Sequence, residues 1–321
     1  MIGVPGNAGA PAVILVGPTA SGKSELALDL AKRFGGWILS IDSMAVYRGL
    51  DIGTSKPSKA VRLQVPHRGL DLQDPDRDCS LGDFLRAADE ALAEMRAAGA
   101  VPILVGGTGL YLRGVLKGVS DLPRRDPGLR ERLLRLEDEQ GAGTLHRLLV
   151  EKDPASARRI ARSDRQRLVR ALELVEKGIV DTVGKAGDEW RAPDRFPSVK
   201  VGLLRSRPEI AQRIAQRVDS FLESGLLEET RGLLEKFPQG GNAFKALGYR
   251  ELAAHLRGEW DLPTAREMII RNTLRYAKRQ MTWFRKESEV RWFEVSGPVE
   301  SAARRIGDYV AERIGSTAGI G

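Results

Sequence analysis

Cysteine is almost absent from this sequence, because only Cys79 among 321 residues is a cysteine. A single cysteine excludes an internal disulfide and also excludes zinc fingers built from several cysteines. The three histidines, His67, His146 and His255, are scattered along the chain, so no metal-binding cluster is visible. These shortages are typical of proteins of the reducing cytoplasm, and we expect that location.

Long hydrophobic runs are missing as well. No apolar run approaches the roughly 18–20 residues that cross a bilayer, so we expect no membrane partner. Residues 1–11 are rich in glycine, alanine and proline and carry no charge, which indicates a loose tail rather than a signal peptide. Hydrophobic residues still make up 42% of the chain, enough for a substantial core.

Acidic residues are outnumbered, with 43 Asp and Glu against 51 Lys and Arg and a net charge of +8. A basic balance favours a polyanionic partner such as nucleic acid. The densest basic segment is residues 158–170, where Asp164 is the one acidic residue. Its six arginines are Arg158, Arg159, Arg162, Arg165, Arg167 and Arg170. The alternative is an ordinary solvated face of a helix.

The most specific motif present is a phosphate-binding P-loop, G-x-x-x-x-G-K-S, between a short apolar strand and a helix. It consists of Gly17, Pro18, Thr19, Ala20, Ser21, Gly22, Lys23 and Ser24. Such a turn directs backbone N–H groups and a helix N-terminus at an anion. Lys23 adds a charge for the terminal phosphate, and the Ser24 hydroxyl suits Mg²⁺.

The hydrophobic pattern alternates between strands and helices, which favours a parallel sheet covered on both faces. Strands are expected at residues 12–16, 36–41, 101–105, 199–204 and 290–295. Helices are expected at residues 25–32, 82–98, 129–139, 144–151, 155–162, 165–177, 208–234 and 263–286, with one more at the end of the chain. Residues 56–78 are expected to form a loop.

Strand signals fade between residues 120 and 195, where charged amphipathic helices replace them. We therefore predict an α/β fold with a P-loop NTPase-like parallel sheet core and an inserted all-helical domain. The predicted organisation is a tail at 1–11, a core at 12–119 and 196–321, and an insertion at 120–195.

The chemistry beyond phosphate binding stays open at this point. The strand at 101–105 ends in Gly106, Gly107 and Thr108 rather than in the acid that P-loop hydrolases use for Mg²⁺, whereas the strand at 36–41 ends at Asp42. A kinase with Asp42 as base remains possible. So does transfer of the organic part of a diphosphate, with the P-loop holding the leaving group.

Seven motifs taken together resemble one family, the bacterial tRNA dimethylallyltransferases, also called tRNA isopentenyltransferases. They run in family order over nearly the whole chain: GPTASGKS (17–24), SIDSMAVYR (40–48) with DIGTSKP (51–57), VGGTGLY (105–111), DRQRLVRALE (164–173), RI with RV (213–218), ALGYRE (246–251) and YAKRQMTWFR (276–285). The resemblance implies a P-loop core with a helical insertion.

The resemblance also implies a reaction, the transfer of dimethylallyl from its diphosphate to N6 of adenosine 37 in tRNAs reading codons that begin with U. The products are N6-isopentenyladenosine and diphosphate. Asp42 matches the family's general base, and Thr19 and Arg217 match residues at the leaving group. Mg²⁺ is the implied cofactor, with Ser24 as its protein ligand. Asp42 as a helix cap or Mg²⁺ ligand is the alternative.

The implied partners are the tRNA anticodon stem-loop and dimethylallyl diphosphate. By resemblance the tRNA contacts are Asp42, Ser43, Met44, Ala45, Thr108, Arg130, Gln166, Arg167, Leu168, Val169, Arg170, Lys245, Ala246, Leu247, Gly248, Tyr249, Arg250, Lys278, Arg279, Gln280, Met281, Thr282, Trp283, Phe284 and Arg285. Helical spacing independently puts basic residues on one face beside aromatic ones, although a solvated basic face over core aromatics fits equally.

Two other functions remain as alternatives, a P-loop kinase for a nucleoside or small metabolite and a non-enzymatic RNA-binding module. The arginine-rich insertion and the missing second acid weigh against the kinase, and Asp42 would be unexplained in a module that only binds RNA. We expect a monomer.

Overall fold

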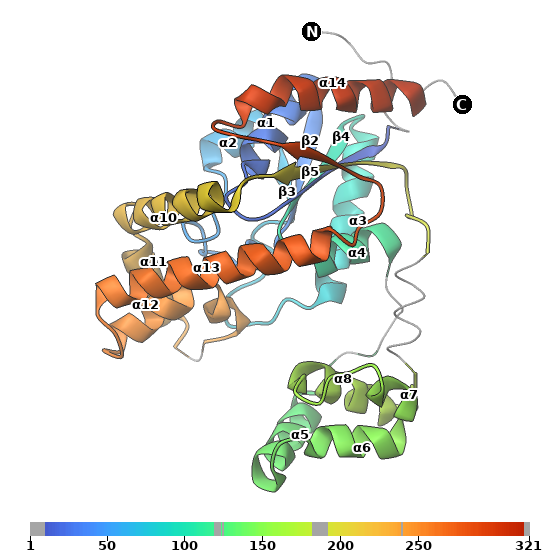
Figure 1. The fold of residues 1–321 in the computed structure, drawn as a ribbon, viewed down its shortest axis with the longest axis vertical. Coiled ribbons are helices and arrows are strands. Elements are labelled where there is room, and N and C mark those ends of the chain that lie inside the picture. The colour runs from blue at the N-terminus through green and yellow to red at the C-terminus, as the bar shows by residue number, and fades with distance from the viewer. Residues whose placement is uncertain (1–9, 119–122, 124, 182–191, 239, 318–321) are drawn as a thin grey trace. The chain divides into compact units, whose positions relative to one another are not determined.

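The structure is a computed structural model that describes residues 10–118, 123, 125–181, 192–238 and 240–317 (Figure 1). Contacts divide the chain into two compact units, one formed by Met1–Val115 with Phe196–Gly321 and the other by Leu116–Arg195. The first boundary falls a few residues before the 119/120 boundary inferred from the sequence, and the second falls at 195/196. Residues 1–9 of the expected tail lie outside the described residues, and Pro11 is buried.

The larger unit is built on a six-stranded sheet in the order β3-β2-β4-β1-β5-β6. All neighbouring strands are parallel, which confirms the predicted α/β class. The strands are β1 (Ala12–Val16), β2 (Gly36–Ile41), β3 (His67–Arg68), β4 (Val101–Gly106), β5 (Ser198–Leu204) and β6 (Val290–Glu294). Only β3 was missed, because a two-residue strand is too short to show a periodic pattern.

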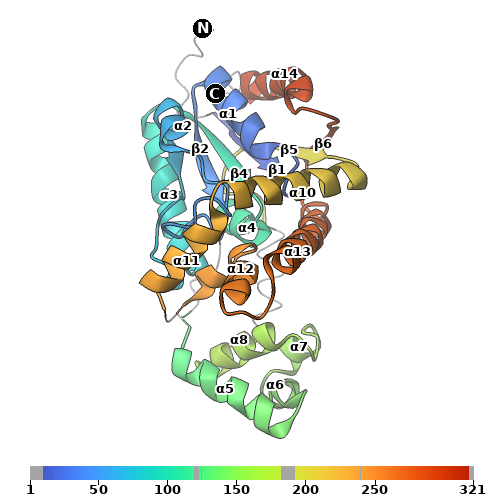
Figure 2. The ribbon, with the colours of Figure 1, turned by 90° about the vertical axis from the view of Figure 1, so that its left-hand side faces the viewer.

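Helices cover both faces of this sheet, with α1 and α14 packed together on one side and α3 on the other (Figure 2). The helices of the unit are α1 (Lys23–Phe34), α2 (Lys59–Gln64), α3 (Leu81–Ala97), α4 (Gly109–Lys117, which crosses the first boundary), α10 (Arg207–Glu223), α11 (Leu226–Lys236), α12 (Tyr249–Leu256), α13 (Leu262–Phe284) and α14 (Glu300–Thr317). A 3₁₀ turn, η2, spans Asn242–Lys245.

One predicted helix was wrong, since residues 208–234 form two helices rather than one. Gly225 separates them with a left-handed φ of 92°, a conformation that glycine adopts without strain. In addition α2, α4 and α12 form where the sequence pattern predicted no helix.

The core of the unit lies between the sheet and the α1–α14 layer. All five residues of β1 are buried, as expected for a central parallel strand covered on both faces. Leu26, Leu30 and Phe34 recur every fourth residue on α1 and form its buried stripe, against which Ile306 of α14 also packs.

The carboxyl ends of three adjacent strands meet at one edge, where the site forms. The P-loop follows β1 and Asp42 follows β2, while the register pairs Ile41 with Gly106 at the end of β4. The Thr108 amide donates to the Ile41 carbonyl at 3.1 Å. A Cβ on Gly106 would lie 2.0 Å from the Ile41 oxygen, so only glycine permits this close approach.

The smaller unit is helical, with α5 (Pro127–Gln140), α6 (Thr144–Lys152), α7 (Pro154–Ala157) and α8 (Arg165–Val175) around an aliphatic core that includes Leu145, Leu149 and Leu172. The helix predicted at 155–162 is a single turn, after which the chain bends and carries Ile160 into that core. Glu137 is buried and caps α6 by accepting the amides of Gly143 and Leu145 at 2.8 and 2.7 Å.

Candidate active site at the carboxyl edge of the sheet

The P-loop has the backbone geometry expected of an anion cradle. Gly17 and Gly22 adopt φ values of 144° and 96°. A Cβ on Gly17 would lie 2.9 Å from the Leu203 carbonyl oxygen, so β5 packs too closely for a side chain there. Lys23 is the first residue of α1, and its ammonium donates to the Pro18 carbonyl at 2.6 Å. The loop therefore closes on itself through Lys23.

Lys23 is an unusual lysine because its side chain is buried. Its pKa is lowered to about 7, chiefly by burial and also by the Arg217 guanidinium, while Asp42 acts in the opposite direction. With a pKa of about 7, Lys23 is only partly protonated at neutral pH. A bound anionic ligand would favour its charged form.

Two arginines of α10 reach the loop from one face of that helix. Arg217 donates to the Thr19 hydroxyl at 3.4 Å and to the Ser55 hydroxyl at 2.6 Å. Arg213 donates to the Ala20 carbonyl at 2.8 Å, and its second contact is Glu25 at 3.8 Å. Burial lowers the pKa of Arg217, while Asp42 acts to raise it. Arg217 is therefore a desolvated cation held beside the Thr19 hydroxyl.

Gln280 of α13 links the P-loop to the end of β4. Its Oε1 accepts the Thr19 amide at 2.8 Å and its Nε2 donates to the Gly107 carbonyl at 3.1 Å. Tyr276, one helical turn earlier, donates its hydroxyl to the same carbonyl at 3.2 Å. Gln280 is only 5% exposed and lines the P-loop cavity, so it forms part of the wall of the site.

Asp42 stands between the strand ends with one carboxylate oxygen occupied. Its Oδ1 accepts the amides of Met44 and Ala45 at 2.8 and 3.3 Å, and because residues 43–46 form a turn and no helix, Asp42 is not a helix cap. Among the described residues no hydrogen bond engages Oδ2. One oxygen thus fixes the side chain and the other is left to accept a proton.

Two cavities of the larger unit meet at these residues. The first, of about 550 Å³, is lined by the P-loop and by apolar side chains that include Ile38, Val61 and Leu70. The second, of about 420 Å³, opens between α10, the 245–250 segment and α13. Five residues line both cavities: Thr19, Asp42, Thr54, Arg217 and Tyr276.

The loop that carries Thr54 and Ser55 is held from behind by a partly buried network of hydrogen bonds. Glu229 of α11 accepts the Ile52 amide at 3.1 Å, and the Tyr249 hydroxyl donates to Glu229 at 2.5 Å and accepts the Gly53 amide at 3.0 Å. Burial and Glu229 raise the pKa of Tyr249, so the phenol stays protonated.

Lys56 fixes the other end of this loop. Its side chain is 1% exposed, and its ammonium contacts Asp71 at 2.6 Å and Asp51 at 2.9 Å. The same ammonium donates to the Tyr47 carbonyl at 2.5 Å. Both ends of the loop are therefore fixed, which positions the Ser55 partner of Arg217.

Comparison with known proteins assigns the family. The model of the IPP transferase family matches residues 45–287, and that of the isopentenyl transferase family matches residues 11–70. The chain belongs to the IPP transferase family.

Relatives in this family match most of the chain. It is 42% identical over 306 residues to the tRNA dimethylallyltransferase of Desulforudis audaxviator, covering 94% of this chain and 98% of that protein. It is 44% identical over 289 residues to the enzyme of the same name from Symbiobacterium thermophilum, covering 90% of each chain. A crystal structure of the tRNA isopentenylpyrophosphate transferase from Bacillus halodurans superposes with a TM-score of 0.72 at 34% identity, covering 97% of this chain and 99% of that one.

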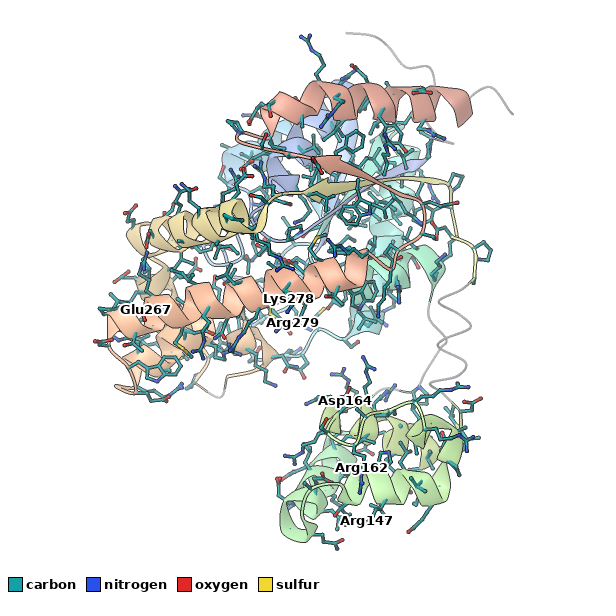
Figure 3. All side chains as sticks on the ribbon, in the orientation of Figure 1. Arg147, Arg162, Asp164, Glu267, Lys278 and Arg279 are labelled. Atoms are coloured by element: carbon teal, nitrogen blue, oxygen red, sulfur yellow. The ribbon has the colours of Figure 1, made fainter. Side chains whose placement is uncertain are left out.

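The structure of this IPP transferase brings many of the predicted tRNA contacts together at the second cavity. Those lining it are Asp42, Ser43, Met44, Lys245, Ala246, Leu247, Gly248, Arg250 and Arg279. Lys278 lies beside Arg279 on α13 and is exposed (Figure 3). Thr282 and Arg285 are exposed as well. Thr108 is half-buried and accepts the Ser43 amide at 3.0 Å.

Other predicted contacts are packing residues. Ala45, Tyr249, Gln280 and Phe284 are each at most 5% exposed. Met281 is half-buried. Trp283 packs against Gly109, where a Cβ would lie 2.2 Å from the indole ring, and it stacks on the Arg113 guanidinium at 4.0 Å. These side chains shape the site but offer little surface to an RNA.

The predicted contacts of the helical unit divide in the same way. Gln166 and Arg167 are exposed, whereas Leu168 and Val169 are fully buried in the unit's core. Arg130 pairs with the buried Glu173 at 3.0 Å. Arg170 is half-buried, contacts the same carboxylate at 3.6 Å and donates to the Pro123 carbonyl at 2.7 Å. Arg147 and Arg162 contribute further positive charge to this unit (Figure 3).

The site also uses five residues that had no role predicted from the sequence, namely Thr54, Ser55, Lys56, Tyr276 and Glu229. The first three lie in the DIGTSKP motif, so the motif was a signal that their backbone position matters. Tyr276 is the first residue of the YAKRQMTWFR motif, so a motif was a signal there too, whereas Glu229 lies in no motif and only the fold places it here. Among the described residues no cluster of three histidine, cysteine or acidic side chains forms a metal site, and no helix has the length and apolarity to cross a bilayer.

Proposed function

We propose that this IPP transferase moves a dimethylallyl group from dimethylallyl diphosphate to N6 of adenosine 37 in tRNAs that read codons beginning with U. The observation that carries this proposal is the pair of cavities that share Thr19, Asp42 and Arg217. A transfer between two substrates needs both to meet at one point, with leaving-group and proton-accepting residues at that point.

The first cavity suits the prenyl diphosphate. The P-loop amides and Lys23 face the phosphates, and Ile38, Val61 and Leu70 offer an apolar wall to the five-carbon group. As the C1–O bond breaks, its electron pair passes to the diphosphate. Thr19 and Arg217 are placed to stabilise the charge that develops there.

The second cavity suits a nucleobase that has left the stack of an RNA loop. Extruding a base costs a few kcal/mol, and RNA loops are the usual targets of sequence-specific readers. The N6 lone pair is delocalised into the adenine ring, so N6 is a weak nucleophile. Asp42, which lines both cavities, accepts the N6 proton as the new C–N bond forms.

The residues of the site suit Mg²⁺ with the Ser24 hydroxyl as its protein ligand. The Ser24 hydroxyl lines the first cavity at the N-terminus of α1 and is exposed. Mg²⁺ commonly binds through one or two protein oxygens together with substrate phosphates and waters, so a single hydroxyl is an adequate protein ligand. When bound, the ion would neutralise part of the diphosphate charge.

The anticodon stem-loop is the proposed RNA partner, and the transfer takes place in the cytoplasm by a monomer. The exposed basic residues around the second cavity, such as Lys245, Arg250 and Arg279, are placed to meet phosphates near the extruded base. Gln166 and Arg167 are the candidate contacts of the helical unit.

Label transfer tests the proposal. The purified protein is mixed with radiolabelled dimethylallyl diphosphate and an unmodified tRNA that carries A36-A37-A38, or with the same tRNA carrying G37. We expect label only in the A37 tRNA. Transfer of phosphate from ATP to a small molecule, with no label in tRNA, would instead favour the kinase alternative.

A further inference from the structure

Arg205 lies directly behind the P-loop, and its side chain is completely buried. It follows β5, and its side chain is 0% exposed. Its Nε donates to the Ser21 carbonyl at 2.9 Å and its Nη1 donates to the Gly297 carbonyl at 2.6 Å. The same Nη1 pairs with Glu209, whose carboxylate also accepts the Gly297 amide at 3.0 Å. One guanidinium thus joins the P-loop, the start of α10 and the turn before α14.

The contact with the Ser21 carbonyl controls the orientation of a P-loop amide. A peptide unit is planar and trans, so its C=O and the following N–H point in opposite directions. A donor fixed on the Ser21 oxygen therefore turns the Gly22 N–H the other way, and Gly22 lines the first cavity. Arg213 holds the preceding peptide through the Ala20 carbonyl in the same manner.

A gain in folding stability does not explain why a buried arginine occupies this position. A guanidinium taken out of water loses hydration that its partners must replace. Among the described residues Arg205 Nη2 is buried without a hydrogen-bond partner, so the replacement is incomplete. A hydrophobic side chain would fill the same space at lower cost, whereas it could not orient the Ser21–Gly22 peptide or place a positive charge behind it.

We propose that Arg205 is a positioning residue for the diphosphate, acting through the Ser21–Gly22 peptide rather than by touching the substrate. It is not among the residues that line either cavity. The inference rests on the proposed function only for the identity of the prenyl substrate, because any diphosphate would be held by the same amide.

The test is the affinity of Arg205→Met and Arg205→Lys for inorganic diphosphate, measured by calorimetry, and the KM for dimethylallyl diphosphate and for tRNA. We expect diphosphate affinity to fall on the order of tenfold or more in Arg205→Met and by less in Arg205→Lys, which keeps the charge. The KM for dimethylallyl diphosphate should rise in parallel, with the KM for tRNA within about twofold of wild type.

Arg33→Met is the matched control. Arg33 lies near the C-terminal end of α1, the helix that follows the P-loop, and pairs with Asp308 of α14 at 2.6 Å. Its replacement therefore removes an ion pair that does not contact the P-loop. Unchanged diphosphate affinity in Arg205→Met would overturn the proposal. A second result would also overturn it: diphosphate and tRNA binding weakened to the same extent in both Arg205 variants, together with a lowered melting temperature. If the wild type binds diphosphate but transfers no prenyl group, the proposed function fails while the calorimetric test of Arg205 still stands.

Discussion

Gln280 accepts the backbone amide of Thr19 at 2.8 Å, although 261 positions separate the two residues. The same side chain donates to the Gly107 carbonyl at 3.1 Å, so one amide group joins α13, the P-loop and the end of β4. Its two partners require opposite ends of the amide, one an acceptor and one a donor, which fixes its orientation. Because Gln280 holds the Thr19 backbone, it also helps to position the Thr19 hydroxyl, which accepts a hydrogen bond from Arg217.

Gln280→Leu should lower the transfer rate more than it weakens tRNA binding. Leucine keeps most of the volume but leaves the Thr19 amide and the Gly107 carbonyl without this partner. Misplacing Thr19 at the leaving group should reduce kcat on the order of tenfold or more. Single-turnover kinetics with saturating substrates measure this directly. A normal kcat with a raised KM for tRNA would instead make Gln280 an RNA contact.

The binding of dimethylallyl diphosphate should weaken as pH rises above about 7, where burial places the pKa of Lys23. Lys23 is then neutral in the free protein, and the anion must recover a proton to meet an ammonium. Affinity should fall by up to about tenfold per pH unit, with proton uptake visible by calorimetry in two buffers. Lys23→Arg keeps its charge and controls for titration of the ligand, so a pH slope equal to wild type in this variant would refute the assignment.

The same pKa has a consequence for stability with a defined sign. Lys23 has a depressed pKa of about 7 when folded and an ordinary value of 10.5 when unfolded, so the unfolded chain binds more protons between these values. The Lys23 contribution to the free energy of unfolding should therefore rise with pH across this window. Urea unfolding of wild type and Lys23→Met at several pH values isolates it. An opposite or absent difference would show that the ammonium is not desolvated.

Tyr249→Phe should destabilise the loop that carries Ser55. The change removes the hydroxyl that contacts Glu229 at 2.5 Å and Gly53 at 3.0 Å, leaving Glu229 short of a donor inside the protein. A loss of about 1–3 kcal/mol in the free energy of unfolding is expected, with a lowered kcat. Tyr309→Phe, on the remote helix α14, is the control. If Tyr249→Phe only weakens tRNA binding, the phenol acts on the RNA rather than on the loop.

In the helical unit Arg130→Ala and Arg167→Ala should behave differently. Arg130 contacts Glu173, whose side chain is 1% exposed, so its removal leaves that carboxylate with Arg170 at 3.6 Å and the Asp126 amide, and should cost about 1–3 kcal/mol. Arg167 is 72% exposed and its contact with Asp164 contributes less than about 1 kcal/mol. Denaturant unfolding and tRNA filter binding separate them. We expect Arg167→Ala to weaken tRNA binding without loss of stability, and equal unfolding of both variants would contradict this.

The sequence was sufficient for features that depend on local patterns. Five apolar strands, the P-loop and Asp42 at a strand end were all predicted, because buried parallel strands and glycine-rich turns leave continuous signals. The strand β3 has only two residues and leaves no such signal. The break at Gly225 was missed because helical periodicity continues on both sides of it.

The candidate site was predictable to the extent that its residues lie in motifs. Whether a motif residue faces a ligand or the core is decided by packing, which is why Tyr249, Gln280, Leu168 and Val169 appear among predicted RNA contacts although they are buried. Arg205 and Glu229 belong to no motif with a chemical role, and their contacts span many positions of the chain. Only the folded structure shows what they hold.

The central claim is that the two substrates meet at Asp42, and Asp42→Asn tests it most directly. The asparagine keeps an oxygen for the Met44 and Ala45 amides but cannot accept the N6 proton. Rapid mixing of the variant, preloaded with labelled dimethylallyl diphosphate, with A37 tRNA measures the single-turnover rate. The account predicts near-normal binding of both substrates and a transfer rate lowered by about 10²–10⁴-fold. Transfer at the wild-type rate would contradict it.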